Sequence, residues 1–219
     1  FFKNIFFQSM PISVSICGYA LAAAIIFTYV GQSGEYAVAG YGVGTRIEQV
    51  VLLPILGINT AIISIIAQNY GANNLVRIKE TYFTAIKYAF IIMITAGTLV
   101  FLSASVITSF FSSDPEVIEY GKRYLKISAF VLPAYPVFFL SNGFFMALKK
   151  SENAMISNFF RNVLNPIAVF YIAKYINASF ETFFWLWVGI NWFFSISYFF
   201  IIIYYFKLKL NKPSTVVHP

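Results

Sequence analysis

Residues 38–68 read VAGYGVGTRIEQVVLLPILGINTAIISIIAQ, and this stretch indicates the solvent in which the chain folds. Its second half, from Val50 to Ala67, contains no charged residue. About 20 mostly apolar residues, each rising about 1.5 Å along a helix, match the roughly 30 Å hydrocarbon core of a bilayer. Residues 38–68 therefore predict a transmembrane helix.

Similar apolar stretches follow one another along the whole chain, separated by short polar turns. The expected helices cover about residues 5–29, 38–68, 82–111, 117–148, 153–175 and 182–206. Only 11% of all residues are charged and 59% are hydrophobic, whereas soluble domains carry roughly 25% charged residues. The sequence predicts an all-α, polytopic membrane protein with one six-helix lobe, residues 1–206, and a polar cytoplasmic tail, residues 207–219.

The loops between these helices alternate between two membrane faces and differ in charge. One face receives Lys3, Arg77, Lys79, Lys149, Lys150, Lys207, Lys209 and Lys212. The other receives Glu35, Asp114, Glu116, Glu119 and Glu181, together with Lys122, Arg123, Lys126 and Lys174. Lys and Arg in short loops stay cytoplasmic, so we expect both ends of the segment in the cytoplasm. The net charge of +7 then reflects topology, and a nucleic-acid partner is not expected.

Residues suited to catalysis or metal binding are scarce. Cys17 is the single cysteine, which excludes an intramolecular disulfide and a cysteine-cluster metal site. The single histidine, His218, lies in the polar tail, and the sequence has no acidic pair, nucleophile elbow or metal-ligand cluster. We therefore expect neither an enzyme nor a resident cofactor.

Arg46 and Glu48 lie inside the second predicted helix, where ionisable groups are unusual. An arginine at the bilayer centre costs about 2.5–3.5 kcal/mol on insertion scales, so such groups usually face protein, a cavity or a partner. Residues two positions apart point to different helix faces, and we expect both side chains to seek partners on other helices. Two interpretations stay open: the pair supports helix packing or lies near the outer interface, or Glu48 takes up a proton or cation.

Prolines and glycines mark possible bends in the second and fourth helices. Pro54 and Gly57, and then Pro133 and Pro136, remove backbone hydrogen bonds or permit bending. These four residues are candidate hinges, although static kinks would have the same sequence signature.

Glycines also recur at residues 40, 42 and 44. No strand precedes them, so a nucleotide-binding loop is not expected. Gly40 and Gly44, four residues apart, instead favour close contact with a neighbouring helix.

The fourth and fifth helices carry polar side chains. Asn158, Arg161, Asn162 and Asn165 recur at three- and four-residue spacing, which predicts a wet or interhelical face. For Asn142 we favour a hydrogen bond between helices. Arg161 lies near the cytoplasmic end of its helix, and we expect its side chain to extend to the membrane surface.

Several motifs of the chain resemble those of a known family. AGYGVGTRIEQ (39–49), Leu53-Pro54 and AQNYGANN (67–74) resemble the eighth helix and following loop of the MATE, or multidrug and toxic compound extrusion, transporters. FSSDPEVI (111–118) and NGFFMAL (142–148) look like the family's ninth-to-tenth loop and tenth helix. The resemblance covers essentially the whole chain and places it in the C-terminal half of such a protein.

The resemblance implies a twelve-helix fold in the plasma membrane, in which a missing N-terminal six-helix lobe and this lobe enclose a cavity that opens to each side in turn. Family substrates are amphiphilic organic cations and drugs, exported in exchange for protons or Na⁺. Aromatic side chains suit such substrates, since their faces attract cations. Membrane lipid and small molecules are the expected partners.

Some family members carry coupling carboxylates at positions that correspond to Tyr19 and Tyr135 here. Tyrosine cannot replace a carboxylate at neutral pH, so in this lobe Glu48 is the carboxylate that could substitute. Other members place the coupling aspartate in the first helix of the N-terminal lobe, outside this sequence. Arg46 and Glu48 are thus candidate coupling or gating residues, and Tyr19, Gln49, Tyr135 and Asn142 are candidate cavity residues.

The multidrug interpretation has two alternatives. A lipid-linked oligosaccharide flippase of the same superfamily would carry Arg and Lys at membrane depth, where Arg46 is the clear example. A non-transporting membrane scaffold would use Arg46 and Glu48 for assembly alone.

Overall fold

The computed structural model describes residues 2–207, with side chains from residue 17 onward, and residues 208–219 of the expected tail lie outside this range. The helices are α1 (Phe2–Gly31), α2 (Glu35–Gly71), α3 (Leu75–Ser109), α4 (Pro115–Ser128), α5 (Tyr135–Ala147), α6 (Ser151–Phe159), α7 (Asn165–Tyr175) and α8 (Phe180–Tyr205). A 3-10 turn, η1 (Leu132–Ala134), joins α4 to α5, and a π-helical turn, η2 (Phe160–Leu164), joins α6 to α7. Within residues 2–207 there is no strand, which agrees with the predicted all-α class.

Four helical segments of the described region are long and apolar enough to cross a membrane. They are Glu35–Gly71, Leu75–Ser109, Pro115–Ala147 and Phe180–Tyr205, and Cys17–Gly31 forms a shorter apolar helix. Helix α2 is longer than the expected residues 38–68, while the expected fourth and fifth helices are each divided into two pieces.

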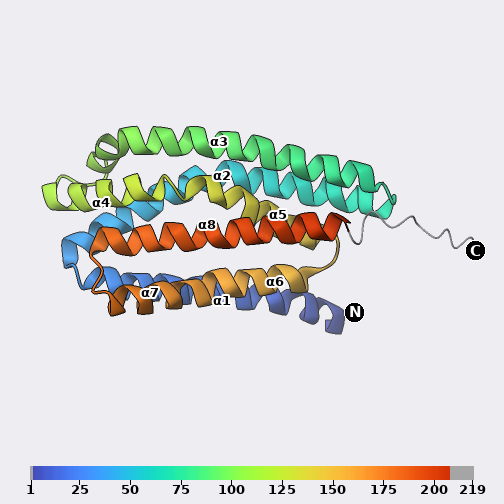
Figure 1. The fold of residues 1–219 in the computed structure, drawn as a ribbon, viewed down its shortest axis with the longest axis horizontal. Coiled ribbons are helices and arrows are strands. Elements are labelled where there is room, and N and C mark those ends of the chain that lie inside the picture. Colours follow the sequence, from blue (N-terminus) through green and yellow to red (C-terminus); the bar gives the residue numbers. More distant parts are fainter. Residues whose placement is uncertain (1, 208–219) are drawn as a thin grey trace, which may run out of the picture.

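The helices lie side by side in one elongated bundle (Figure 1). Helix α2 contacts α3, α4 and α5, whereas α1 contacts α6, η2 and α7 on the opposite side of the bundle. Helix α8 lies between these groups and contacts α4, α5 and α7. The start of α1, the α2–α3 and α5–α6 turns and the end of α8 all lie at one end of the bundle.

Short polar side chains fix the starts of α4 and α8. Asp114 accepts hydrogen bonds from the backbone N–H groups of Glu116 (2.8 Å) and Val117 (3.4 Å), and Pro115 occupies the first turn. Ser179 caps α8 in the same way through the N–H of Thr182. These caps satisfy donors that no intrahelical carbonyl can reach.

The break between α4 and α5 follows from proline. Pro133 has no N–H, so it cannot donate to the carbonyl of Phe130 three residues earlier. Trp192 on α8 donates its indole N–H to that oxygen (2.8 Å), and the Ser195 hydroxyl donates to the Ala134 carbonyl (3.1 Å). Backbone groups freed at membrane depth need such partners, so α8 stabilises the break.

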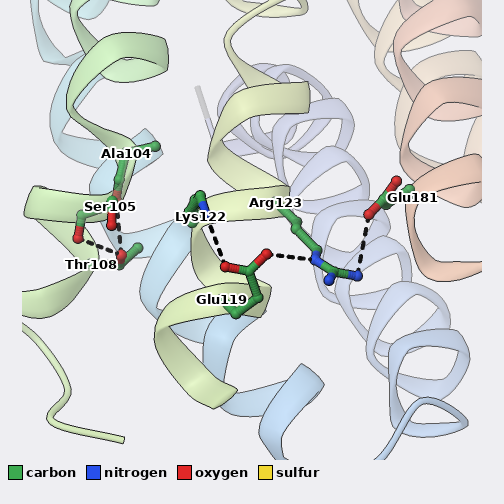
Figure 2. A network of polar contacts seen from close by, with 7 residues as sticks. All are labelled: Ala104, Ser105, Thr108, Glu119, Lys122, Arg123 and Glu181. Atoms are coloured by element: carbon green, nitrogen blue, oxygen red, sulfur yellow. Dashed lines mark hydrogen bonds and ion pairs between the residues drawn. The ribbon is translucent and has the colours of Figure 1, made fainter. Parts of the chain in front are cut away.

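A polar network lies at the end of the bundle where α4 and α8 begin (Figure 2). Glu119 pairs with Lys122 (2.9 Å) and Arg123 (3.0 Å) on its own helix, and Arg123 reaches Glu181 on α8 (3.3 Å). These side chains are partly exposed, and exposed ion pairs contribute at most about 1 kcal/mol each. The network therefore links the two helix starts only weakly.

Candidate functional site

Glu48 is a half-buried carboxylate that two tyrosines hold from the broken helix. The Tyr124 hydroxyl on α4 donates to its Oε2, and the Tyr135 hydroxyl at the start of α5 donates to its Oε1 at 2.5 Å. Residues eleven positions apart share a face of a continuous helix but lie about 16 Å apart along its axis. The two phenol rings therefore approach Glu48 from opposite sides of the break.

Two glycines bring α2 close enough to α4 for this contact. A Cβ at Gly40 would lie 2.7 Å from the backbone nitrogen of Gly121, and a Cβ at Gly44 would lie 2.2 Å from Cδ1 of Tyr124. Residues 40, 44 and 48 share one face of α2, since four residues make just over one turn. The predicted close contact at Gly40 and Gly44 is confirmed, and it presents Glu48 to α4 and α5.

Arg161 lies on the other side of Tyr135. Its guanidinium carbon is 4.8 Å from the centre of the Tyr135 ring and 4.1 Å from that of Phe138. Its Nε donates to Oδ1 of Asn191 on α8 at 3.3 Å. Tyr135 thus separates a carboxylate from a guanidinium, with its hydroxyl on Glu48 and its ring face on Arg161.

The expectation that Arg161 extends to the membrane surface was wrong. The side chain is only 8% exposed, because it belongs to the π-helical turn η2 and aromatic rings of α5 cover it. The extra residue in a π turn shifts the helix register, which places both Arg161 and Asn162 in the interior. Cation–π contacts here replace the aqueous contacts that the sequence pattern led us to expect.

The other predicted residues lie in different environments. Arg46 and Gln49 are exposed, and Tyr19 is 51% exposed. Asn142 is buried and bonds to Asn158 (3.2 Å) and Tyr198 (3.0 Å), which confirms the interhelical hydrogen bond.

The candidate hinges also divide into two groups. Pro54 lies inside an uninterrupted α2, and Gly57 is exposed on the same helix. Pro133 and Pro136 lie at the break, in η1 and in the first turn of α5.

The sequence analysis did not predict that Tyr124 and Asn191 belong to this cluster. It named Arg161 but did not predict that this side chain lies in the interior. Tyr124 gave no signal because it is one of 15 tyrosines. An arginine at membrane depth was the available signal for Arg161, since such a residue usually pairs with other groups.

Glu48 is the only carboxylate among the residues named in this cluster. Within residues 17–207, no three His, Cys, Asp or Glu side chains come together as metal ligands. Ion pairs in the same region join Glu119, Lys122, Arg123 and Glu181, so Glu48 has no direct ionic partner there. An ionised carboxylate held only by hydroxyl donors retains acceptor capacity for a proton or a monovalent cation.

Comparison with known proteins places this chain in a family. The family profile MatE matches residues 11–171. The chain belongs to the MatE family. Among its relatives, the FAD transporter of Shewanella oneidensis is 25% identical over 158 residues, which are 72% of this chain and 35% of the relative. The probable multidrug resistance protein YpnP of Bacillus subtilis is 26% identical over 164 residues, 75% of this chain and 34% of the relative.

Solved structures agree on the fold. A MOP superfamily transporter from Pyrococcus furiosus superposes with a TM-score of 0.87 at 22% identity, covering 93% of this chain and 46% of that one. An outward-facing multidrug resistance MATE family transporter superposes with a TM-score of 0.84 at 23% identity, covering 93% of this chain and 46% of that one. This MatE chain therefore spans about half the length of the solved transporters, and its matches cover about a third of the curated relatives.

Proposed function

We propose that this MatE chain is the C-terminal lobe of a secondary transporter that exports drugs or organic cations by alternating access. A second, N-terminal six-helix lobe completes the cavity, and H⁺ or Na⁺ is the exchanged ion. In this lobe Glu48 takes up the coupling cation. Both ends of the segment face the cytoplasm of a cell whose plasma membrane the protein crosses several times.

The observation that carries this proposal is the Tyr124–Glu48–Tyr135 contact. It connects α2 with both halves of the broken helix α4–α5. When Glu48 binds a proton, one carboxyl oxygen becomes a donor and can no longer accept a tyrosine hydrogen bond in the same way. Cation binding at Glu48 therefore changes how α2 is held against the break, which is the coupling that antiport requires.

Relatives support export of small molecules. YpnP and the Staphylococcus haemolyticus protein MepA, 25% identical over 154 residues, carry names that refer to multidrug resistance and export. Aromatic side chains make up 20% of the chain, and their faces can attract organic cations of varied shape.

The test is export of a fluorescent organic cation from cells that express the full-length protein. Cells with the native protein should accumulate less dye than empty cells. Glu48→Gln keeps the size of the side chain but cannot ionise, and we expect it to abolish gradient-driven export at matched abundance. Everted vesicles driven by a proton gradient alone, or by a Na⁺ gradient alone, then identify the ion.

Glu80→Gln is the matched control, because Glu80 is exposed on α3. The Glu80→Gln protein should export dye like the native protein. If Glu48→Gln lowers abundance but the protein that remains exports normally, Glu48 serves packing. If the native protein never lowers dye accumulation, the organic-cation substrate class is wrong.

A further inference from the structure

A cavity opens between α5, α6, η2 and α8, and Arg161 is one of its lining residues. Its volume is about 430 Å³. Its wall is rich in aromatic side chains, among them Phe138, Phe145, Phe160, Phe194 and Tyr198, and Ser157 and Ser197 add hydroxyl groups. The rim is accessible, since Phe193 is 68% and Tyr204 64% exposed. The space is therefore apolar, open at one side, and large enough for a drug-sized molecule, for which pockets of about 300–1,000 Å³ are usual.

Arg161 contributes the positive charge of this cavity. Arg161 is only 8% exposed, and its Nη1 is buried with no hydrogen-bond partner. Its Nε reaches Asn191, and its faces lie against the rings of Phe138 and Tyr135. A buried donor on a charged group is costly when it is left unpaired. Arg161 is thus a lining residue of the cavity, and it carries a donor, enclosed by protein, that has no acceptor.

We propose that this cavity binds a small amphiphile with a carboxylate head, which pairs with Arg161 while its aromatic or aliphatic body lies against the Phe and Tyr wall. Guanidinium and carboxylate match in geometry, because two parallel N–H groups can meet two oxygens. Arg161 repels organic cations, so this site differs in ligand charge from the proposed exchange at Glu48 and does not depend on it.

The size of the cavity favours a single small molecule over a phospholipid. A phospholipid brings two long acyl chains, whereas a volume of about 430 Å³ lies within the usual range for one drug-sized molecule. Anionic phospholipid carries the same kind of oxygen acceptor, so the experiment includes it as a competitor.

Binding is measured on the purified full-length protein in phosphatidylcholine nanodiscs, with fluorescent pyrenebutyrate and its uncharged amide, pyrenebutyramide, as probes. Both probes have the same apolar body, and empty nanodiscs correct for partition into lipid. We expect Arg161→Gln to weaken pyrenebutyrate about tenfold or more and to leave the amide within about twofold. Ser197→Phe, which fills the cavity, should weaken both probes. Arg77→Gln, an exposed arginine on α3, should change neither.

If Arg161→Gln does not fold, Arg161→Lys replaces it. The lysine ammonium keeps the positive charge but lacks the two parallel N–H groups of the guanidinium. Binding of pyrenebutyrate should then weaken severalfold, and binding of the amide should not change. Equal losses for both probes in the arginine variants would overturn the proposal, as would unchanged binding in Ser197→Phe. Displacement of pyrenebutyrate by phosphatidylglycerol at membrane concentrations would assign the site to a lipid headgroup and overturn the small amphiphile.

Discussion

Gly44 lies one helical turn before Glu48, and its missing side chain gives Tyr124 room to reach the carboxylate. A Cβ there would lie 2.2 Å from Cδ1 of Tyr124, so Gly44→Ala must displace the ring. We expect a destabilisation of about 1–3 kcal/mol, the usual range for overpacking, measured as a lower thermal unfolding midpoint of the purified protein.

Gly42→Ala is the matched control for that variant. Nothing lies within 4 Å of a Cβ at Gly42, so this change should leave the midpoint unchanged or raise it slightly. If the two variants lower the midpoint equally, helix flexibility and not the Tyr124 contact explains the glycines.

Residue-level prediction from sequence succeeded where the partner did not matter. Small residues four apart predicted a close helix contact at Gly40 and Gly44, and a mid-helix amide predicted the interhelical bonds of Asn142. The partners themselves, such as Tyr124 for Glu48, depend on which helices become neighbours. Periodicity within one helix carries no information on that choice.

At the scale of the element, the broken helix α4–α5 depends on α8. The carbonyl of Phe130 loses its intrahelical donor at Pro133 and accepts instead from Trp192. Trp192→Phe keeps an aromatic ring but removes the donor. Leaving that acceptor unpaired should cost about 1 kcal/mol or more, seen as a lower unfolding midpoint.

Trp185→Phe tests whether loss of any indole has the same effect. Trp185 packs against the Phe130 ring, with centroids 5.3 Å apart, and phenylalanine keeps an aromatic ring in that position. We expect a smaller shift than for Trp192→Phe. The opposite ranking would show that the ring contact, and not the hydrogen bond, holds the break.

The positions of the breaks were only partly predictable. Pro133 and Pro136 indicated a bend in the fourth helix, and the structure places the break there. The π turn at Phe160–Leu164 was not predicted, because its residues fit an ordinary helix. Pro166 was the available marker, since it cannot donate to the carbonyl of Asn162 inside the turn. The register shift of the turn changed the expected environment of Arg161 from surface to interior.

At the scale of the whole molecule, the two ends of the bundle differ in charge. The end with the α2–α3 and α5–α6 turns has more basic than acidic residues: Arg77, Lys79, Lys149 and Lys150 against Glu80 and Glu152. The opposite end carries Glu35, Asp114, Glu116, Glu119 and Glu181 together with Lys122, Arg123, Lys126 and Lys174. This segregation follows the alternation of loops that the apolar pattern predicted. Which end faces the cytoplasm is a proposal that rests on the preference of Lys and Arg for that side.

Single cysteines at the two ends test this orientation. On a Cys17→Ser background, Glu116→Cys and Arg77→Cys each place one thiol at an exposed position, the first in α4 and the second in α3. A membrane-impermeant maleimide should label Glu116→Cys in intact cells and Arg77→Cys only after permeabilisation. The Cys17→Ser protein alone is the blank, and equal labelling of both variants in permeabilised cells verifies that each thiol is reactive. The two positions lie at opposite ends of the bundle, so only one of them can face the outside of the cell. If intact cells label Arg77→Cys and spare Glu116→Cys, the orientation of the lobe is the reverse of the one proposed.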